Sequence, residues 1–133
     1  MRRRNKNTET QQLPTEAELE ILNVLWSSGP STVRDVHEAL ASRGTGYTTV
    51  LKQMQVMAEK GLLSRSEEQR SHVYSANIAR EKTRQRLARN LLDRAFAGSA
   101  ADLVLGALSA QRVSPEELAE IRRMLDQYEK EGR

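Results

Sequence analysis

Residues 46–61 have the sequence GYTTVLKQMQVMAEKG, and this stretch decides the predicted fold. Its apolar residues Val50, Met54 and Met57 recur at helical spacing and define one face of an amphipathic helix. Gly61 is placed to end the helix, because glycine readily adopts the left-handed conformation found at helix C-termini. Polar side chains cover the opposite face, so the stretch predicts a helix that packs on one side and presents the other to a partner.

Two further helices are predicted upstream of this stretch. The first begins at the capping box Thr15-Glu16-Ala17-Glu18 and should stop at the breaker SSGP, residues 27–30. Either Ser31 or Thr32 can cap a short second helix, which ends before the glycine-containing segment 42–46.

Downstream of Gly61 the hydrophobic period changes. Two short runs, residues 62–66 and 73–75, flank a polar stretch and predict a two-stranded hairpin. The helical pattern returns from Ile78 and breaks at Gly98. A last helix then begins at Ser114-Pro115-Glu116-Glu117, which combines a capping serine with proline at the first helical position.

The order helix–helix–helix–strand–wing–strand is that of the winged helix-turn-helix, in which one helix enters the DNA major groove and the hairpin meets the adjacent backbone. We therefore predict a mostly α fold with a small β-hairpin. Residues 1–13 are expected to form a disordered basic arm, 14–76 a winged-helix DNA-binding domain and 77–133 a helical dimerisation domain.

Composition favours a helical binding protein over an enzyme. Of the 133 residues 29% are charged and 4% aromatic, and there is no Cys, so disulfides, Fe–S clusters and Cys-type zinc sites are excluded. His37 and His72 stand outside any metal-binding motif, and neither a nucleophile–base framework nor a Gly-rich phosphate loop is present. We expect no catalysis, no metal and no cofactor. A long apolar segment and a signal peptide are also lacking, which favours a cytoplasmic protein.

The third helix and the hairpin supply the candidate DNA-binding residues. Hydroxyl groups at a helix start bind phosphate, glutamine pairs with adenine in a bidentate manner, and lysine reaches phosphate or guanine. Alternatively, the threonine hydroxyls can cap the helix, and the lysine and glutamine side chains can be ordinary solvated surface. The candidates are Tyr47, Thr48, Thr49, Lys52, Gln53, Arg65, Arg70 and His72.

The C-terminal part has too few large apolar groups to complete a core alone. Apolar residues of the last helix follow one another at spacings of 3, 4 and 3, a pattern typical of paired helices. Two copies are therefore predicted to share one core, with Leu91 and Leu92 beside Phe96 as an alternative contact surface. The candidate dimerisation residues are Phe96, Leu103, Val104, Leu108, Leu118, Ile121, Leu125 and Tyr128.

Residues 80–94 form a basic cluster, with six basic residues against Glu81 and Asp93. The cluster can contact DNA phosphates beside a binding site, or it can pair with Glu116, Glu117 and Glu120 in the C-terminal part. The net charge of +3 permits nucleic-acid binding without requiring it, so both roles stay open.

Five segments carry a resemblance to a known family: PTEAELEILNVLW, STVRDVHEAL, GYTTVLKQMQVMAEKGLL, RSHVYSA and the tail FAGSAADLVLGAL with SPEELAEIRRML. They run from about Leu13 to Tyr128, and they resemble the penicillinase repressors (BlaI/MecI type) of bacterial β-lactam resistance. The resemblance implies a homodimeric winged-helix repressor on an inverted-repeat DNA operator, inactivated when a membrane sensor protease triggers its cleavage. Cleavage is expected near residues 97–103, where Gly98-Ser99-Ala100-Ala101 interrupts two helical patterns.

Two alternatives to this function stay open. A winged helix can hold a protein partner through its hairpin and third helix, and a repressor can respond to a non-proteolytic signal. DNA binding weakens linearly with the logarithm of salt concentration, whereas docking through an apolar surface hardly responds to salt. Salt dependence therefore separates a DNA-binding domain from a protein-interaction module.

Overall fold

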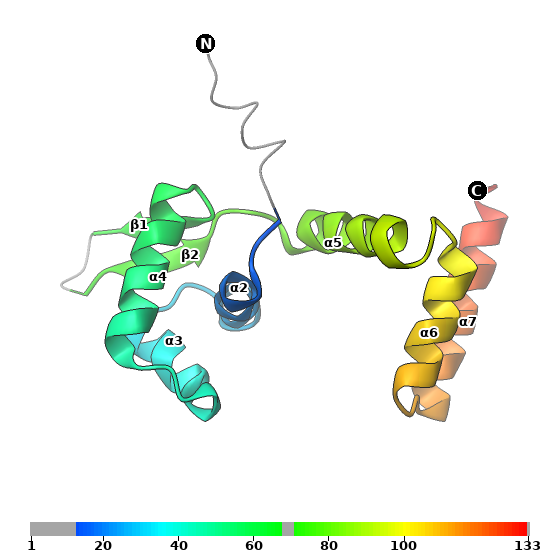
Figure 1. Cartoon of the computed structure of the whole chain (residues 1–133), viewed down its shortest axis with the longest axis horizontal. Coiled ribbons are helices and arrows are strands. Elements are labelled where there is room, and N and C mark those ends of the chain that lie inside the picture. The colour runs from blue at the N-terminus through cyan, green and yellow to red at the C-terminus, as the bar shows by residue number, and fades with distance from the viewer. Residues whose placement is uncertain (1–12, 68–70, 133) are drawn as a thin grey trace, which may run out of the picture. The chain divides into compact units, whose positions relative to one another are not determined.

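The computed structural model describes residues 13–67 and 71–132 (Figure 1). The predicted mostly helical fold with one small hairpin is confirmed. Most of the predicted arm, residues 1–12, lies outside the described residues. The elements in chain order are α2 (Glu16–Ser28), α3 (Val33–Ala39), the 3₁₀ turn η1 (Ala41–Arg43), α4 (Tyr47–Glu59), β1 (Leu63–Ser66), β2 (Val73–Ala76), α5 (Arg80–Ala95), α6 (Ala100–Ala110) and α7 (Pro115–Lys130).

The chain divides into two compact units between Leu87 and Ala88. Helix α5 therefore begins in the N-terminal unit and ends in the C-terminal unit. The expected boundary after residue 76 separates a DNA-binding domain from a dimerisation domain, not two compact units, and it stays a prediction.

One apolar core holds the N-terminal unit together. Helix α2 contacts α3, α4 and β2, and helix α4 also contacts α3 and β1. The predicted apolar face of α4 is confirmed, because Val50, Met54 and Met57 are fully buried. The core consists of Ile21, Leu22, Leu25, Val33, Val36, Val50, Met54, Met57, Leu62, Leu63 and Tyr74.

Helix α4 ends as its sequence predicts. Gly61 adopts a left-handed conformation, with φ 87°. The Gly61 amide donates to the Ala58 carbonyl, and the Leu62 amide donates to the Met57 carbonyl at 2.9 Å. This hydrogen-bond pair is a Schellman motif, and its two apolar members, Met57 and Leu62, are both in the core. The chain is thereby turned directly from α4 into the hairpin.

The structure shows which of the two candidate residues, Ser31 or Thr32, caps the start of α3. Thr32 is the N-cap and forms a capping box with Asp35. Ser31 instead pairs with Tyr74 of β2, with backbone N–H···O distances of 2.9 and 2.8 Å in the two directions. This isolated bridge adds a third strand position beside the antiparallel β1–β2 pair. Sequence alone predicted two strands, because a one-residue bridge has no periodicity to detect.

Polar contacts distant in sequence fix the hairpin and the following segment. The Asn77 side chain donates to the Gly61 carbonyl at 3.0 Å and accepts from the Ser64 hydroxyl at 3.1 Å. The indole N–H of Trp26 donates to the carbonyl of Ile78 at 3.1 Å. These hydrogen bonds satisfy polar groups at the end of the hairpin. The Asn77–Gly61 bond holds the hairpin base to the end of α4, and the Trp26–Ile78 bond holds the segment after the hairpin to α2.

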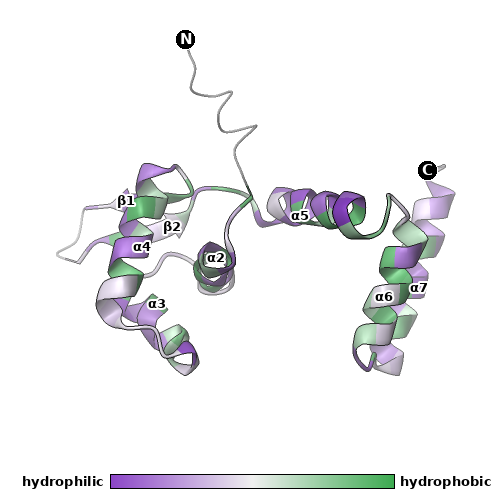
Figure 2. Ribbon diagram, in the orientation of Figure 1, coloured by the Kyte–Doolittle hydropathy of each residue, from purple (hydrophilic) through white to green (hydrophobic). Residues whose placement is uncertain are grey.

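The C-terminal unit has no comparable core. No residue of α6 or α7 is buried, although α6 is strongly apolar (Figure 2). The ring of Phe96 packs over Gly106, where an added Cβ would lie 3.3 Å from the ring. Large apolar side chains nevertheless remain 46–64% exposed, namely Leu91, Val104, Leu105, Met124, Leu125 and Tyr128. Within the described part of the chain, no helix is long and apolar enough to cross a membrane.

An ion pair connects the start of α2 with the end of α4. The Nζ atom of Lys60 lies 2.6 Å from Oε2 of Glu18, whose Oε1 accepts from the Thr15 amide at 3.0 Å. Burial alone raises the pKa of Glu18, but the hydrogen bonds from Lys60 and Thr15 and the charge of Lys60 outweigh burial and lower it.

We expect Glu18→Gln to lower the free energy of unfolding at pH 7 by roughly 1 kcal/mol, because the half-exposed Lys60 limits the strength of the pair. Glutamine keeps the capping box, so the change isolates the charge. Because the pKa of Glu18 is lower in the folded state than its ordinary value of 4.5, the charged carboxylate stabilises the folded state at any pH above 4.5. This stabilisation is lost as the pH falls through the folded-state pKa. Urea unfolding of both proteins should therefore differ at pH 7 and converge in acid.

The matched control is Glu16→Gln, which removes an exposed carboxylate from the same first turn. It should change stability far less than Glu18→Gln. An equal loss in both variants, or a Glu18→Gln deficit that persists in acid, would contradict the role of the ion pair.

Candidate nucleic-acid interface

The exposed face of α4 is fixed by the burial of its opposite face. Its N-cap is Gly46, and no side chain caps this helix start, so Thr48 and Thr49 do not serve the ordinary capping role. Both threonines are exposed, as is Lys52. We call the exposed residues that follow Tyr47 in this helix the α4 stripe; it consists of Thr48, Thr49, Lys52, Gln55, Val56 and Glu59.

The predicted base-contacting residue Gln53 lies at the edge of this stripe and is half-buried. Gln55, in contrast, is exposed, three residues after Lys52 and four before Glu59, so it shares their face of the helix. Helical periodicity already contained this distinction, because Gln53 is three residues from the buried Val50 and four from the buried Met57. The sequence analysis did not select Gln55, although helical spacing could have identified it.

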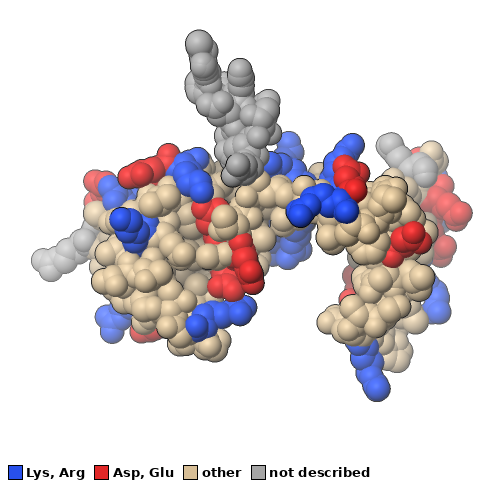
Figure 3. All heavy atoms as spheres, viewed as in Figure 1, with Lys and Arg blue, Asp and Glu red and all other residues tan. Residues whose placement is uncertain are grey.

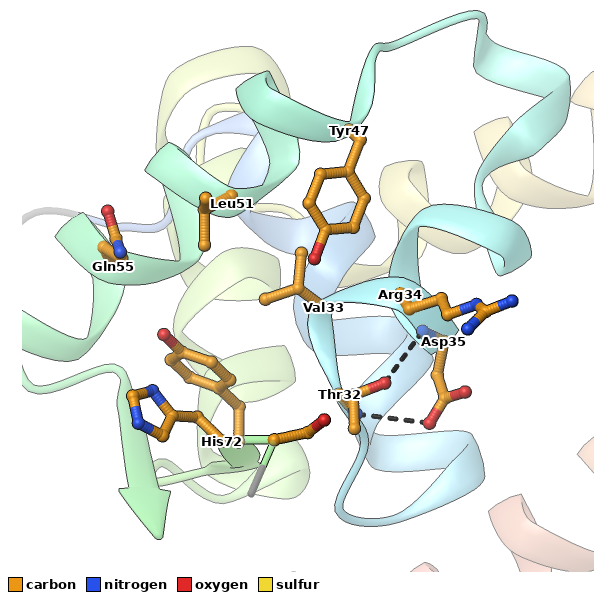
Figure 4. A pocket seen from close by; sticks show the side chains of 10 residues that line it. Thr32, Val33, Arg34, Asp35, Tyr47, Leu51, Gln55 and His72 are labelled. Carbon is orange, nitrogen blue, oxygen red and sulfur yellow. Dashed lines mark hydrogen bonds between the residues drawn. The ribbon is translucent and has the colours of Figure 1, made fainter. Parts of the chain in front are cut away.

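Two grooves border α4, and Gln55 lines both. The first, of about 530 Å³, lies between α4, the start of α3 and the hairpin. Figure 4 shows Tyr47, Leu51 and Gln55 of α4, Thr32 and Val33 of the α3 segment, and His72 around this groove. The second, of about 590 Å³, lies between α4 and β1 and is lined by Gln55, Ala58, Glu59, Leu63, Arg65 and Glu67.

Tyr47 is the first residue of α4, and its ring is positioned by α3. The rings of Tyr47 and His37 meet edge to face, with centroids 5.7 Å apart and an interplanar angle of 81°. The Tyr47 residue is still 45% exposed. Its side chain is therefore oriented at the groove without being buried.

The hairpin candidates have different surroundings. Hydrogen bonds with Tyr74 and Glu67 raise the pKa of Arg65, and its Nη2 lies 2.7 Å from Oε2 of Glu67. An approaching phosphate would have to compete with this carboxylate for Arg65. His72 is exposed and lines the first groove. Arg70 lies outside the described residues.

Basic side chains gather over α5 (Figure 3). The exposed members of this cluster are Arg80, Lys82, Arg84, Arg89 and Arg94. Within the described part of the C-terminal unit, Arg89 and Arg94 form no ion pair with the exposed Glu116, Glu117 or Glu120. The two roles considered for the cluster, contact with DNA and pairing in the C-terminal part, both stay predictions. Among residues 13–67 and 71–132, no group of three or more His, Asp or Glu side chains is placed to hold a metal ion.

A helix packed through one face against two others, with an antiparallel hairpin beside it, defines the winged-helix class. Within that class, the profile of the penicillinase repressor family matches residues 14–127. The chain therefore belongs to the penicillinase repressor family, as its sequence motifs indicated.

The relatives are regulators of transcription. The chain is 26% identical to the penicillinase repressor of Bacillus licheniformis over 86% of this chain and 90% of the relative. It is 33% identical to the transcriptional regulator BlaI of Mycobacterium tuberculosis over 86% of this chain and 83% of the relative. The solution structure of apo-NmtR is 24% identical, with a TM-score of 0.44 over 82% of this chain and 75% of that one.

The two glutamines of α4 form a matched pair for a test of base recognition. We expect Gln55→Ala to weaken binding to the preferred DNA duplex and to relax preference at one base pair, by about 1–3 kcal/mol for one bidentate contact. Gln53→Ala should have the smaller effect, because that side chain is half-buried at the edge of the stripe. Competition binding against single-base-pair variants measures both. If only Gln53→Ala loses its preference among the base-pair variants, Gln53 and not Gln55 is the base-contacting residue.

Proposed function

We propose that this protein is a sequence-specific transcriptional repressor that binds an inverted-repeat DNA operator as a homodimer. The observation that carries the proposal is the α4 stripe, a polar helix face fixed by a rigid core and bordered by grooves on both sides. Such a helix fits the major groove, where side chains meet base edges. Membership of a family of transcriptional regulators supports the same function.

The residues of the interface divide into positioning and base-contacting groups. Thr48 and Thr49 are suited to phosphate because they carry hydroxyl groups in the first turn of α4, where no side chain caps the helix start. Lys52 can reach phosphate or guanine, and a glutamine, Gln53 or Gln55, can pair with adenine. Around them, Tyr47 and the hairpin residues Arg65, Arg70 and His72 would contact the adjacent backbone.

The proposed dimer rests on the incomplete C-terminal unit. Helices α6 and α7 bury no residue, and Leu125 and Tyr128 of α7 are 59% and 60% exposed. A second copy would cover these apolar groups and stabilise both chains. Phe96, Leu103, Leu108, Leu118 and Ile121 are half-buried within one chain, so they would support the shared surface from beneath. Val104, Leu125 and Tyr128 would contact the partner directly.

We expect Leu125→Asp to dissociate the dimer without unfolding the chain, because Leu125 is 59% exposed in one copy. The variant should sediment as a monomer and lose roughly 10²–10⁴ in affinity for a full inverted repeat, since the second half-site contact is no longer intramolecular. Its affinity for a single half-site should stay near wild type. Analytical ultracentrifugation and titration of both duplexes measure these quantities.

Gln127→Asp is the control, because it places a carboxylate on the polar side of the same helix. It should remain dimeric. If Leu125→Asp is a monomer but binds the full repeat with wild-type affinity, dimerisation does not contribute to DNA affinity. If Leu125→Asp remains a dimer, the contact surface lies at Leu91 and Leu92 instead. Binding that ignores salt would refute DNA recognition and favour the protein-interaction module.

Release from DNA is proposed to follow cleavage between Ala97 and Leu103, triggered by a membrane sensor protease. Two facts support this segment as a protease target. Ala97 has a positive φ of 49° and Gly98 one of 80°, and both residues are exposed between α5 and α6. Mass spectrometry of the protein from induced cells should detect a fragment ending in this segment. An intact chain throughout induction would contradict cleavage and support a non-proteolytic signal.

A further inference from the structure

One apolar side chain of the α4 stripe is not explained by the core. Among the described residues of the N-terminal unit, the exposed large hydrophobic side chains are Tyr47 and Val56, and both belong to α4. The ring of Tyr47 already has a partner, because it meets the ring of His37 in an edge-to-face arrangement. Val56 is 37% exposed and points away from the face that carries Met54 and Met57. The fold gains little from a valine there, whereas a contact with a partner would bury it.

The neighbours of Val56 restrict what that partner can be. Val56 follows Lys52 by four residues and precedes Glu59 by three, so the three side chains are adjacent on the helix surface. A protein interface usually needs a wider apolar patch than one valine among charged residues. The Glu59 carboxylate also disfavours a DNA phosphate at this position, because like charges repel. A base edge in the major groove satisfies both constraints.

The major groove offers one apolar group at the base edges, the C5-methyl of thymine. Valine suits this group, because its branched side chain has one strongly preferred rotamer in a helix and loses little freedom on contact. Lysine and glutamine side chains beside it are suited to polar base atoms or phosphate. The stripe thus combines one apolar contact with polar ones.

We propose that Val56 is a specificity-determining residue that contacts the C5-methyl group of one thymine per bound copy. The inference rests on the proposed function, because it requires α4 in the major groove. It adds an apolar contact with a T·A pair to the hydrogen bonds with adenine proposed for a glutamine of α4.

The test removes single methyl groups from the DNA. The duplex is the preferred sequence recovered by in vitro selection with the full chain, and each thymine is replaced in turn by uracil, which lacks only the C5-methyl. One position per bound copy should lose about four-fold in affinity, the equivalent of about 0.8 kcal/mol for one buried methyl-sized group. In Val56→Ser the same replacement should have no effect, while uracil at other positions should act as in wild type.

A second measurement restores the methyl on a different base. Replacing the contacted T·A pair by C·G should weaken binding, and 5-methylcytosine at that position should recover part of the loss in wild type but not in Val56→Ser. Circular dichroism and the melting temperature establish that Val56→Ser keeps the fold, as expected for an exposed position.

The outcomes distinguish the inference from the function on which it rests. If wild type binds the selected duplex but no thymine methyl depends on Val56, the inference is overturned and the proposed function stands. If selection recovers no preferred duplex at all, the proposed function fails. Methyl sensitivity that persists unchanged in Val56→Ser would assign the contact to another residue and likewise overturn the inference.

Discussion

The burial of one face of α4 is the constraint on which the interface depends. Val50, Met54 and Met57 are fully buried, and burying side chains of this kind stabilises a protein by roughly 1.5–3 kcal/mol each. Rotation of α4 about its axis would expose them and lose that stabilisation. The direction of the exposed side chains is therefore set by the core, and the interface residues need no contacts of their own to be oriented. The Schellman motif at Gly61 then places the hairpin beside the same helix.

Local sequence signals predicted the elements of the fold because each signal acts within a few residues. Capping boxes, the glycine that ends α4 and the change from helical to alternating period all lie within one turn or one strand. Contacts between distant residues were not predictable in this way. The Glu18–Lys60 pair spans 42 residues and the Trp26–Ile78 hydrogen bond spans 52, so neither leaves a local pattern. The Ser31–Tyr74 bridge is likewise visible only once α3 and the hairpin are placed.

The candidate interface was predictable at the level of the helix and less so at the level of the side chain. The third helix was correctly expected to expose a polar face with Thr48, Thr49 and Lys52. Gln53 was selected from the sequence, although Gln55 lies 200° away around the helix, at 100° per residue, and the spacing from Val50 and Met57 already placed Gln53 nearer the buried face. Val56 was not among the candidate DNA-binding residues predicted from the sequence, and its exposure became visible only in the structure. The two units also differ in how far they complete their cores, because α6 and α7 bury no residue.

The central claim is that the α4 stripe is the surface that meets DNA. NMR spectra of the isotope-labelled full chain, recorded with and without a duplex selected for binding, test it most directly. The account predicts that the largest amide shifts occur in residues 47–59, with smaller ones at the start of α3 and in the hairpin, while the signals of the core residues Ile21, Leu22 and Leu25 of α2 stay nearly unchanged. Large shifts confined to α5, with α4 unaffected, would contradict the claim and place the DNA on the basic cluster instead.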